Sequence, residues 1–94
     1  MKTLLEAIQT YPEQFISTLH ARANTTPSAV NRMTHETLAD SIELGLWENV
    51  IDIIQLQNYR KPLEGVVFCL DRYSDIDNNV WHQIVDLFNE EKFV

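Results

Sequence analysis

Two tryptophans that lie 34 residues apart each begin nearly the same run of residues. The run from Trp47 reads WENVIDII and the run from Trp81 reads WHQIVDLF, so the apolar positions and one aspartate recur in the same order. Further along, Tyr59 corresponds to Phe93. An internal period of about 20 to 50 residues is typical of a helical hairpin used more than once, because each copy covers the apolar face of the next. The sequence therefore predicts stacked helical hairpins with a 34-residue internal repeat.

The amino-acid composition also favours helices. The chain has 94 residues, of which 45% are hydrophobic, and it contains only two glycines and three prolines. An all-β protein needs many tight turns, and glycine and proline are common in those turns. A domain of this size buries about 60 to 65% of the surface that its unfolded chain exposes, so a core is possible. We therefore expect one all-α domain, a compact bundle of about five to six helices.

The repeat divides the expected domain into units. Residues 34–60 form the first predicted hairpin and residues 61–94 form the second. Residues 1–33 are expected to form divergent helices that cap the array, because repeat arrays need atypical ends.

Capping residues mark several of the expected helix ends. Pro12 can open a helix, since the first helical residue does not need its N–H for the helix. Thr26, which precedes Pro27, predicts the start of a short helix, and Thr34 predicts the start of the next one. That helix is expected to stop near Gly45.

Residues 63–73 have an ambiguous pattern. The segment from Val66 to Leu70 is short, apolar and partly β-branched, which fits either a strand or a buried helix. A helix keeps the two predicted units alike, although Gly65 costs a helix about 1 kcal/mol relative to alanine. We predict a helix, and a strand followed by a wing is the competing interpretation.

One cysteine bears on the cellular compartment. Cys69 is the only thiol of the chain, so no internal disulfide can form, and this fits a reducing compartment. No stretch has the roughly 18 to 20 apolar residues of a membrane span, and polar residues interrupt the first leucines where a signal peptide would be apolar. We expect a cytoplasmic protein that does not enter a membrane.

Residues that could perform catalysis are not arranged for it. His20, His35 and His82 lie far apart in sequence, and none has a second ligand at metal-binding spacing. Asp75 and Asp77 have the alternating spacing of a calcium loop, but the central glycine is missing, so we expect one of them to cap a helix. The sequence contains no glycine-rich phosphate loop and no serine nucleophile elbow. We predict a protein that is not an enzyme and that holds no metal and no cofactor.

Negative charge is concentrated in the repeated part of the chain. The net charge is −7, and residues 36–94 carry twelve acidic residues against four basic ones. Such a field repels phosphates, and nucleic-acid binding depends on Lys and Arg displacing counterions. The charge therefore argues against nucleic acid and favours a partner with a basic surface.

A run of acidic residues is the clearest candidate for a binding surface. Its members recur at helical spacing with no base among them, and we call them the acidic face: Glu36, Asp40, Glu43, Glu48 and Asp52. Like charges four residues apart cost a helix roughly a few tenths of a kcal/mol per pair, which favours a use for the run. We predict a docking surface for a basic partner, where complementary charge speeds encounter and sets specificity. An ordinary solvated helix face is the alternative.

Tyr59 is added to this predicted partner-binding surface. An aromatic ring at a helix end or in a loop can anchor an interface, because it buries a large area at little cost in entropy. The same ring can equally well close the end of a small core. The sequence leaves both roles open.

The run from Gly45 to Ile54 resembles the second helix of tetratricopeptide and pentatricopeptide hairpins, which share a period of about 34 to 35 residues. The resemblance covers residues 34–94 and rests on the period and the apolar spacing. It implies helical hairpin geometry. A pentatricopeptide protein would in addition bind RNA, which the negative charge opposes.

These features predict a small acidic protein that binds another protein as an adaptor, a regulator or an inhibitor. Such a protein can also imitate nucleic acid and block an enzyme that binds DNA or RNA. The alternative is a winged-helix transcriptional regulator, with a helix-turn-helix at residues 26–45 and a wing strand at residues 66–73. An uncovered hairpin face also leaves room for a second copy of the chain, so a homodimer is possible.

Overall fold

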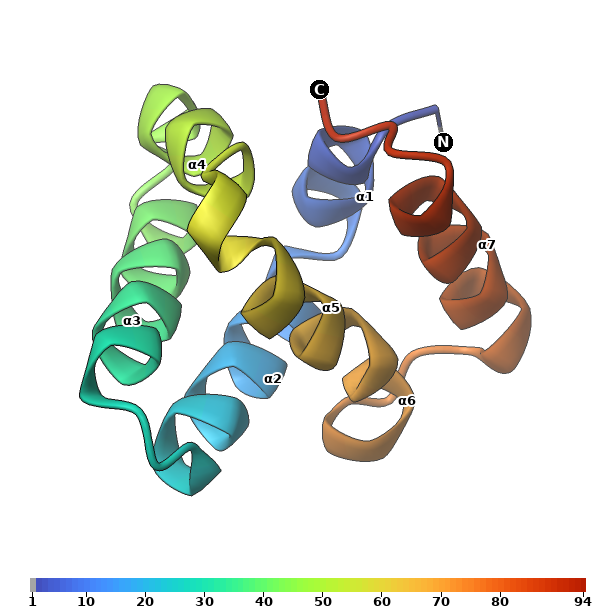
Figure 1. The fold of residues 1–94 in the computed structure, drawn as a ribbon. Coiled ribbons are helices and arrows are strands. Elements are labelled where there is room, and N and C mark those ends of the chain that lie inside the picture. The colour runs from blue at the N-terminus through green and yellow to red at the C-terminus, as the bar shows by residue number, and fades with distance from the viewer. Residues whose placement is uncertain (1) are drawn as a thin grey trace.

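Helices form nearly all of the regular structure. The computed structural model describes residues 2–94, which contain seven α-helices, a 3-10 turn and no strand (Figure 1). In chain order the elements are α1 Leu4–Thr10, α2 Pro12–Thr25, α3 Ala29–Glu43, α4 Trp47–Ile54, η1 Gln57–Tyr59, α5 Arg60–Phe68, α6 Leu70–Tyr73 and α7 Asn78–Asn89. The predicted all-α class is confirmed. None of these helices combines the length and the apolar character that crossing a membrane requires.

Polar side chains and a proline begin several helices, and the starts at Pro12 and Asp77 agree with the sequence prediction. Pro12 is the first residue of α2, where its missing N–H costs no hydrogen bond. Asp77 caps α7 by accepting a hydrogen bond from the backbone N–H of Asn79. Thr3 caps α1 in the same way, with the N–H of Glu6 as the donor.

The start of α3 differs from the prediction. Ser28 caps this helix, and its hydroxyl accepts a hydrogen bond from the N–H of Asn31, whereas the predicted cap Thr26 lies two residues earlier in extended backbone. Thr34 caps nothing, because it lies inside α3 and its hydroxyl donates to the carbonyl of Val30. Since α3 runs unbroken across residue 34, no helix end marks the unit boundary predicted there.

The segment with the ambiguous pattern is helical. Residues 60–68 form α5 and residues 70–73 form α6, with a break at Cys69, so the prediction of helix is confirmed and the wing strand of the alternative is absent from the described chain. The backbone N–H of Cys69 bonds to the carbonyl of Val66, which tightens the last turn of α5. This break makes two short helices where the sequence predicts one, so the expected count of five to six is not confirmed.

The structural surroundings of the two tryptophans differ. Trp47 is the first residue of α4, which follows the single helix α3, whereas Trp81 lies inside α7, which follows the two short helices α5 and α6. The indole N–H of Trp81 donates to the carbonyl of Val67 at 3.1 Å, while Trp47 lies beside Gly45. Buried residues do recur at matching positions, as in Val50 and Ile84. The 34-residue period thus reproduces the apolar spacing of one helix, and a repeat of the whole hairpin is not confirmed.

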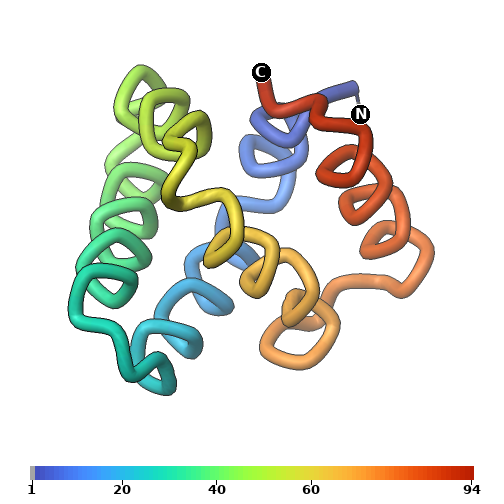
Figure 2. The backbone as a smooth tube through the Cα atoms, in the orientation of Figure 1, coloured from blue at the N-terminus to red at the C-terminus, as the bar shows by residue number. Residues whose placement is uncertain are grey.

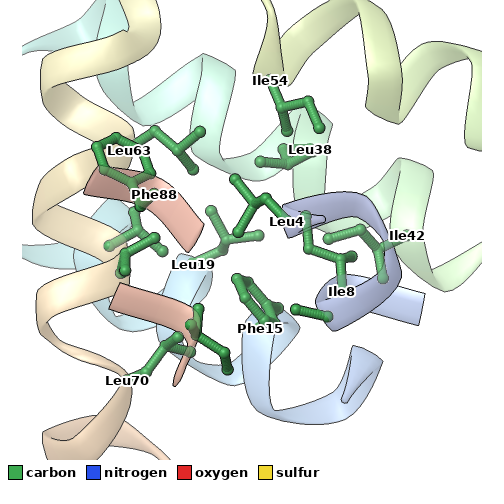
Figure 3. Close-up of a cluster of buried hydrophobic side chains, with 14 of the residues drawn as sticks. Leu4, Ile8, Phe15, Leu19, Leu38, Ile42, Ile54, Leu63, Leu70 and Phe88 are labelled. Carbon is green, nitrogen blue, oxygen red and sulfur yellow. The ribbon is translucent and has the colours of Figure 1, made fainter. Parts of the chain in front are cut away.

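All the helices contribute to one core. Figure 3 shows how their apolar side chains meet, from Leu4 and Ile8 of α1 to Phe88 of α7. Phe15 and Leu19 of α2 lie among them, fully buried. In Figure 1, α3 and α4 form one side of the molecule, α1 and α7 form the other, and α5 lies between them. The chain measures 32 × 27 × 24 Å along its principal axes.

The two ends of the described chain meet (Figure 2). The first N–H groups of α1 have no partner within their own helix, and those of Leu4 and Leu5 donate to the carbonyls of Lys92 and Phe93 at 2.6 and 2.9 Å. The ring of Phe93 packs on Phe88, with 5.1 Å between the ring centroids. These contacts hold the C-terminal segment against α1 and leave α3 and α4 on the far side.

Gly45 ends α3 in a conformation that other residues resist. Its φ is +69°, and the next residue, Leu46, donates its N–H to the carbonyl of Ser41 at 2.9 Å, which closes the helix end. The substitution Gly45→Ala is expected to lower the free energy of unfolding by about 1 to 2 kcal/mol, because a Cβ atom strains the left-handed region. Gly45→Asn is expected to lower it less. Urea denaturation measures both, and an alanine variant as stable as the parent would contradict this assignment.

Candidate functional site

The acidic face lies on the side of the molecule formed by α3 and α4. Glu36, Asp40 and Glu43 are exposed on α3, and their side chains stand away from the buried residues of the same helix. Glu48 and Asp52 are exposed on α4, one helical turn apart. All five carboxylates are therefore in contact with solvent.

The acidic face is not neutralised by ion pairs within residues 2–94. The salt bridges found there join Arg60 to Glu91 at 2.7 Å and Lys92 to Glu90 at 2.9 Å, near the C-terminus. Neither pair includes a residue of the acidic face. Its charges therefore stay available to a partner, screened only by water and salt.

Exposed apolar side chains accompany the acidic face along α3. Val30 is 68% exposed and Met33 is 67% exposed, near the start of the helix. Leu44, the residue that follows the last residue of α3, is 70% exposed. Scattered apolar residues are normal on a protein surface, but these lie on the helix that also carries three acidic residues. The surface therefore offers both charge and apolar area to a partner.

A groove lies where the start of α2 meets the corner between α3 and α4. Its volume is about 680 Å³, and it is lined mainly by apolar residues with two carboxylates and one hydroxyl. The lining residues are Pro12, Glu13, Ile16, Ser17, Ile42, Glu43, Leu44, Gly45 and Trp47. We call it the corner groove. Glu43 belongs both to the corner groove and to the acidic face, so the two surfaces are continuous at that residue.

Tyr59 lies in the core and not on the predicted surface. Only 3% of the residue is exposed, and its hydroxyl lies 2.7 Å from Nδ1 of His35, which is 1% exposed. Of the two roles that the sequence leaves open, the structure confirms the one in which the ring closes a small core. Because its side chain is almost fully buried and its hydroxyl is engaged inside the protein, Tyr59 is left out of the docking surface proposed below.

His35 and Tyr59, together with Arg22, form a polar group that links α3, η1 and α2. Burial, together with the nearby positive charge of Arg22, lowers the pKa of His35 from its usual 6.5 to about 4. Burial raises the pKa of Tyr59, so its hydroxyl keeps its proton and can donate to the neutral ring of His35. Gly65 explains how Arg22 fits: a Cβ atom there would come within 3.1 Å of its guanidinium.

We interpret the buried group of His35, Tyr59 and Arg22 as part of the core and not as a reactive site. Nε of Arg22 is buried and has no hydrogen-bond partner among the described residues, which costs stability. His35 and Tyr59 do not line the corner groove. Within residues 2–94, no three side chains of His, Cys, Asp or Glu lie together as ligands for a metal ion. We therefore place the candidate site on the acidic face and the corner groove.

The residues of the acidic face can be picked out from the sequence, whereas most of the corner groove cannot. The acidic face lies on two neighbouring helices at regular spacing, so its pattern is visible in the sequence. The corner groove needs Glu13 and Ile16 of α2 to approach Trp47 of α4, about 30 residues away in the chain. The one local signal is Gly45, whose turn sets the angle between α3 and α4.

Comparison with known proteins identifies no family for this chain. No protein-family model, no curated protein and no solved structure matches it. The run from Gly45 to Ile54 resembles tetratricopeptide and pentatricopeptide hairpins, but neither family model matches the chain. What the protein does has to be inferred from its own surface.

The buried His35 predicts that the folded protein loses stability in mild acid. Its pKa is depressed in the folded state, so between about pH 6.5 and pH 4 the unfolded chain binds the proton more readily. The free energy of unfolding is expected to fall as the pH is lowered through this window, by up to roughly 3 kcal/mol from this residue. Denaturant titrations of the parent and of His35→Asn, which keeps a polar group near Nδ1, isolate the effect. The difference between the two should shrink as the pH falls, and parallel pH profiles would contradict it.

Proposed function

We propose that the protein is a small acidic binding protein that acts without catalysis, by docking the acidic face of α3 and α4 on a basic surface of another protein. It serves there as an adaptor, a regulator or an inhibitor. The observation that carries the proposal is the state of the five carboxylates: all are exposed, and none is in an ion pair within the described part of the chain.

A rigid support favours this role. Leu38 and Ile42 of α3, with Val50 and Ile54 of α4, are buried in the common core, so the two helices that carry the acidic face are fixed in place. A preformed surface binds without first being ordered, which avoids part of the entropy cost of association. The carboxylates can then act as a fixed array of negative charge.

The charge of the whole molecule supports a basic partner. With a net charge of −7, the protein attracts basic surfaces over a distance set by the ionic strength, about 8 Å in physiological salt. Proteins that bind nucleic acid carry such surfaces, so a partner of that class fits, with the acidic face taking the place of phosphates. The single cysteine fits action in the cytoplasm.

Charge reversal on the acidic face tests the proposal. The variant with Glu36→Lys, Asp40→Lys, Glu48→Lys and Asp52→Lys should lose the partners that the immobilised parent protein retains from an extract of its own cells. The parent should itself release them when the salt concentration is raised, because complementary charge holds the complex. Mass spectrometry identifies the proteins retained by each.

A matched control carries the same change of net charge elsewhere. Glu64→Lys, Asp71→Lys, Asp75→Lys and Asp86→Lys reverse four exposed carboxylates outside the acidic face. This control is expected to retain the same partners as the parent. Equal retention by the parent and by the acidic-face variant would contradict the proposal, and equal loss in both variants would show that net charge, and not this surface, governs binding.

A further inference from the structure

The corner groove joins an apolar floor to an acidic rim. Ile16, Ile42 and Trp47 line it with apolar surface, and Leu44 stands at its edge, 70% exposed. Glu13 of α2 and Glu43 of α3 line the same groove, and both side chains are exposed. Carboxylates from two different helices thus border one apolar recess.

The apolar residues and the two carboxylates together favour an occupant that is partly apolar and positively charged. A lysine or arginine side chain has an apolar stem and a charged end, and it can lay the stem on apolar surface while the end meets carboxylates. The half-buried indole of Trp47 adds a face on which a cation is attracted to the ring. A neutral apolar occupant would contact the apolar residues of the groove and would not interact with its two carboxylates.

We propose that the corner groove receives a basic residue, with an adjacent large apolar residue, from a segment of the partner protein. The apolar neighbour covers Leu44, and the basic side chain enters between Glu13 and Glu43. The inference rests on the proposed function and adds to it the kind of partner segment and the place where that segment is anchored.

Charge argues against a second copy of this chain as the occupant. Each copy carries a net charge of −7, and a copy seated on this groove would bring that charge against Glu13 and Glu43. Like charges placed together at an interface cost binding free energy. A segment of opposite charge gains from the same carboxylates.

A library of random peptides displayed on phage, selected on the immobilised protein, tests the inference. The recovered peptides are expected to place a lysine or arginine beside a large apolar residue. Their binding is then measured by the fluorescence of Trp47 in the Trp81→Phe variant, in which it is the only indole. Glu13→Lys and Leu44→Ser are each expected to weaken this binding by about tenfold.

Two variants serve as matched controls. Leu56→Ser removes an exposed apolar residue that follows α4 and lies outside the groove, and Glu64→Lys reverses an exposed carboxylate of α5. Both are expected to bind the recovered peptides as the parent does, and thermal unfolding checks that all variants are folded. The inference is overturned by peptides without basic residues, by equal losses in test and control variants, or by a homodimer that Leu44→Ser dissociates.

The inference about the groove and the proposed function can be contradicted independently of each other. Glu13 and Leu44 do not belong to the acidic face, and the four residues reversed to test the proposed function do not line the groove. If Glu13→Lys leaves peptide binding intact while the acidic-face variant loses its partners, the inference about the groove falls and the function stands. If peptides depend on the groove while the acidic-face variant keeps its partners, the proposed docking face is wrong.

Discussion

Burial of short helices in one shared core is the constraint on which the structure depends. α1 has seven residues, α4 has eight and α6 has four, and isolated helices shorter than about 12 to 15 residues are marginal in water. Each is stabilised by the side chains that it places in the core, at about 1.5 to 3 kcal/mol for a fully buried Leu, Ile or Phe. The backbone contacts between the start of α1 and the C-terminal segment close this arrangement.

Burial in this core also determines which residues of α3 and α4 stabilise the fold and which remain on the surface. Because the core fixes one side of α3 and α4, their outer sides contribute little to stability and are free to carry charge. Glu36, Asp40 and Glu43 stand along one helix and are in none of the salt bridges of the described chain, although like charges one turn apart weaken a helix. The polar residues that do serve the fold, His35 and Tyr59, are buried and bonded to each other.

Features that depend on residues close together in the sequence are easier to predict than features that depend on distant residues. The all-α class, the start of α2 at Pro12 and a helix cap at Asp75 or Asp77 follow from composition and local patterns, and the structure confirms them, with Asp77 as the cap. The local pattern of residues 63–73 fits a strand as well as a helix, and the structure shows the helix. The position of Ser28 as a cap could not be separated from that of Thr26, because both residues can cap and lie two positions apart.

Features that depend on contacts between distant residues are harder to predict from the sequence. The similar spacing after Trp47 and Trp81 reflects the shared needs of two buried helices, and it does not extend to the elements that precede them. The burial of Tyr59 depends on His35, 24 residues earlier, and no local pattern predicts that contact. The corner groove likewise exists only once α2 packs against α3 and α4.

The central claim is that the side of the molecule formed by α3 and α4 is the surface that binds. Nuclear magnetic resonance of the isotope-labelled protein, titrated with the purified partner, locates the contact residue by residue. The account predicts that the largest changes in amide chemical shift fall on residues 36–52, with little change in α7. Changes confined to α5, α6 and α7 would contradict it.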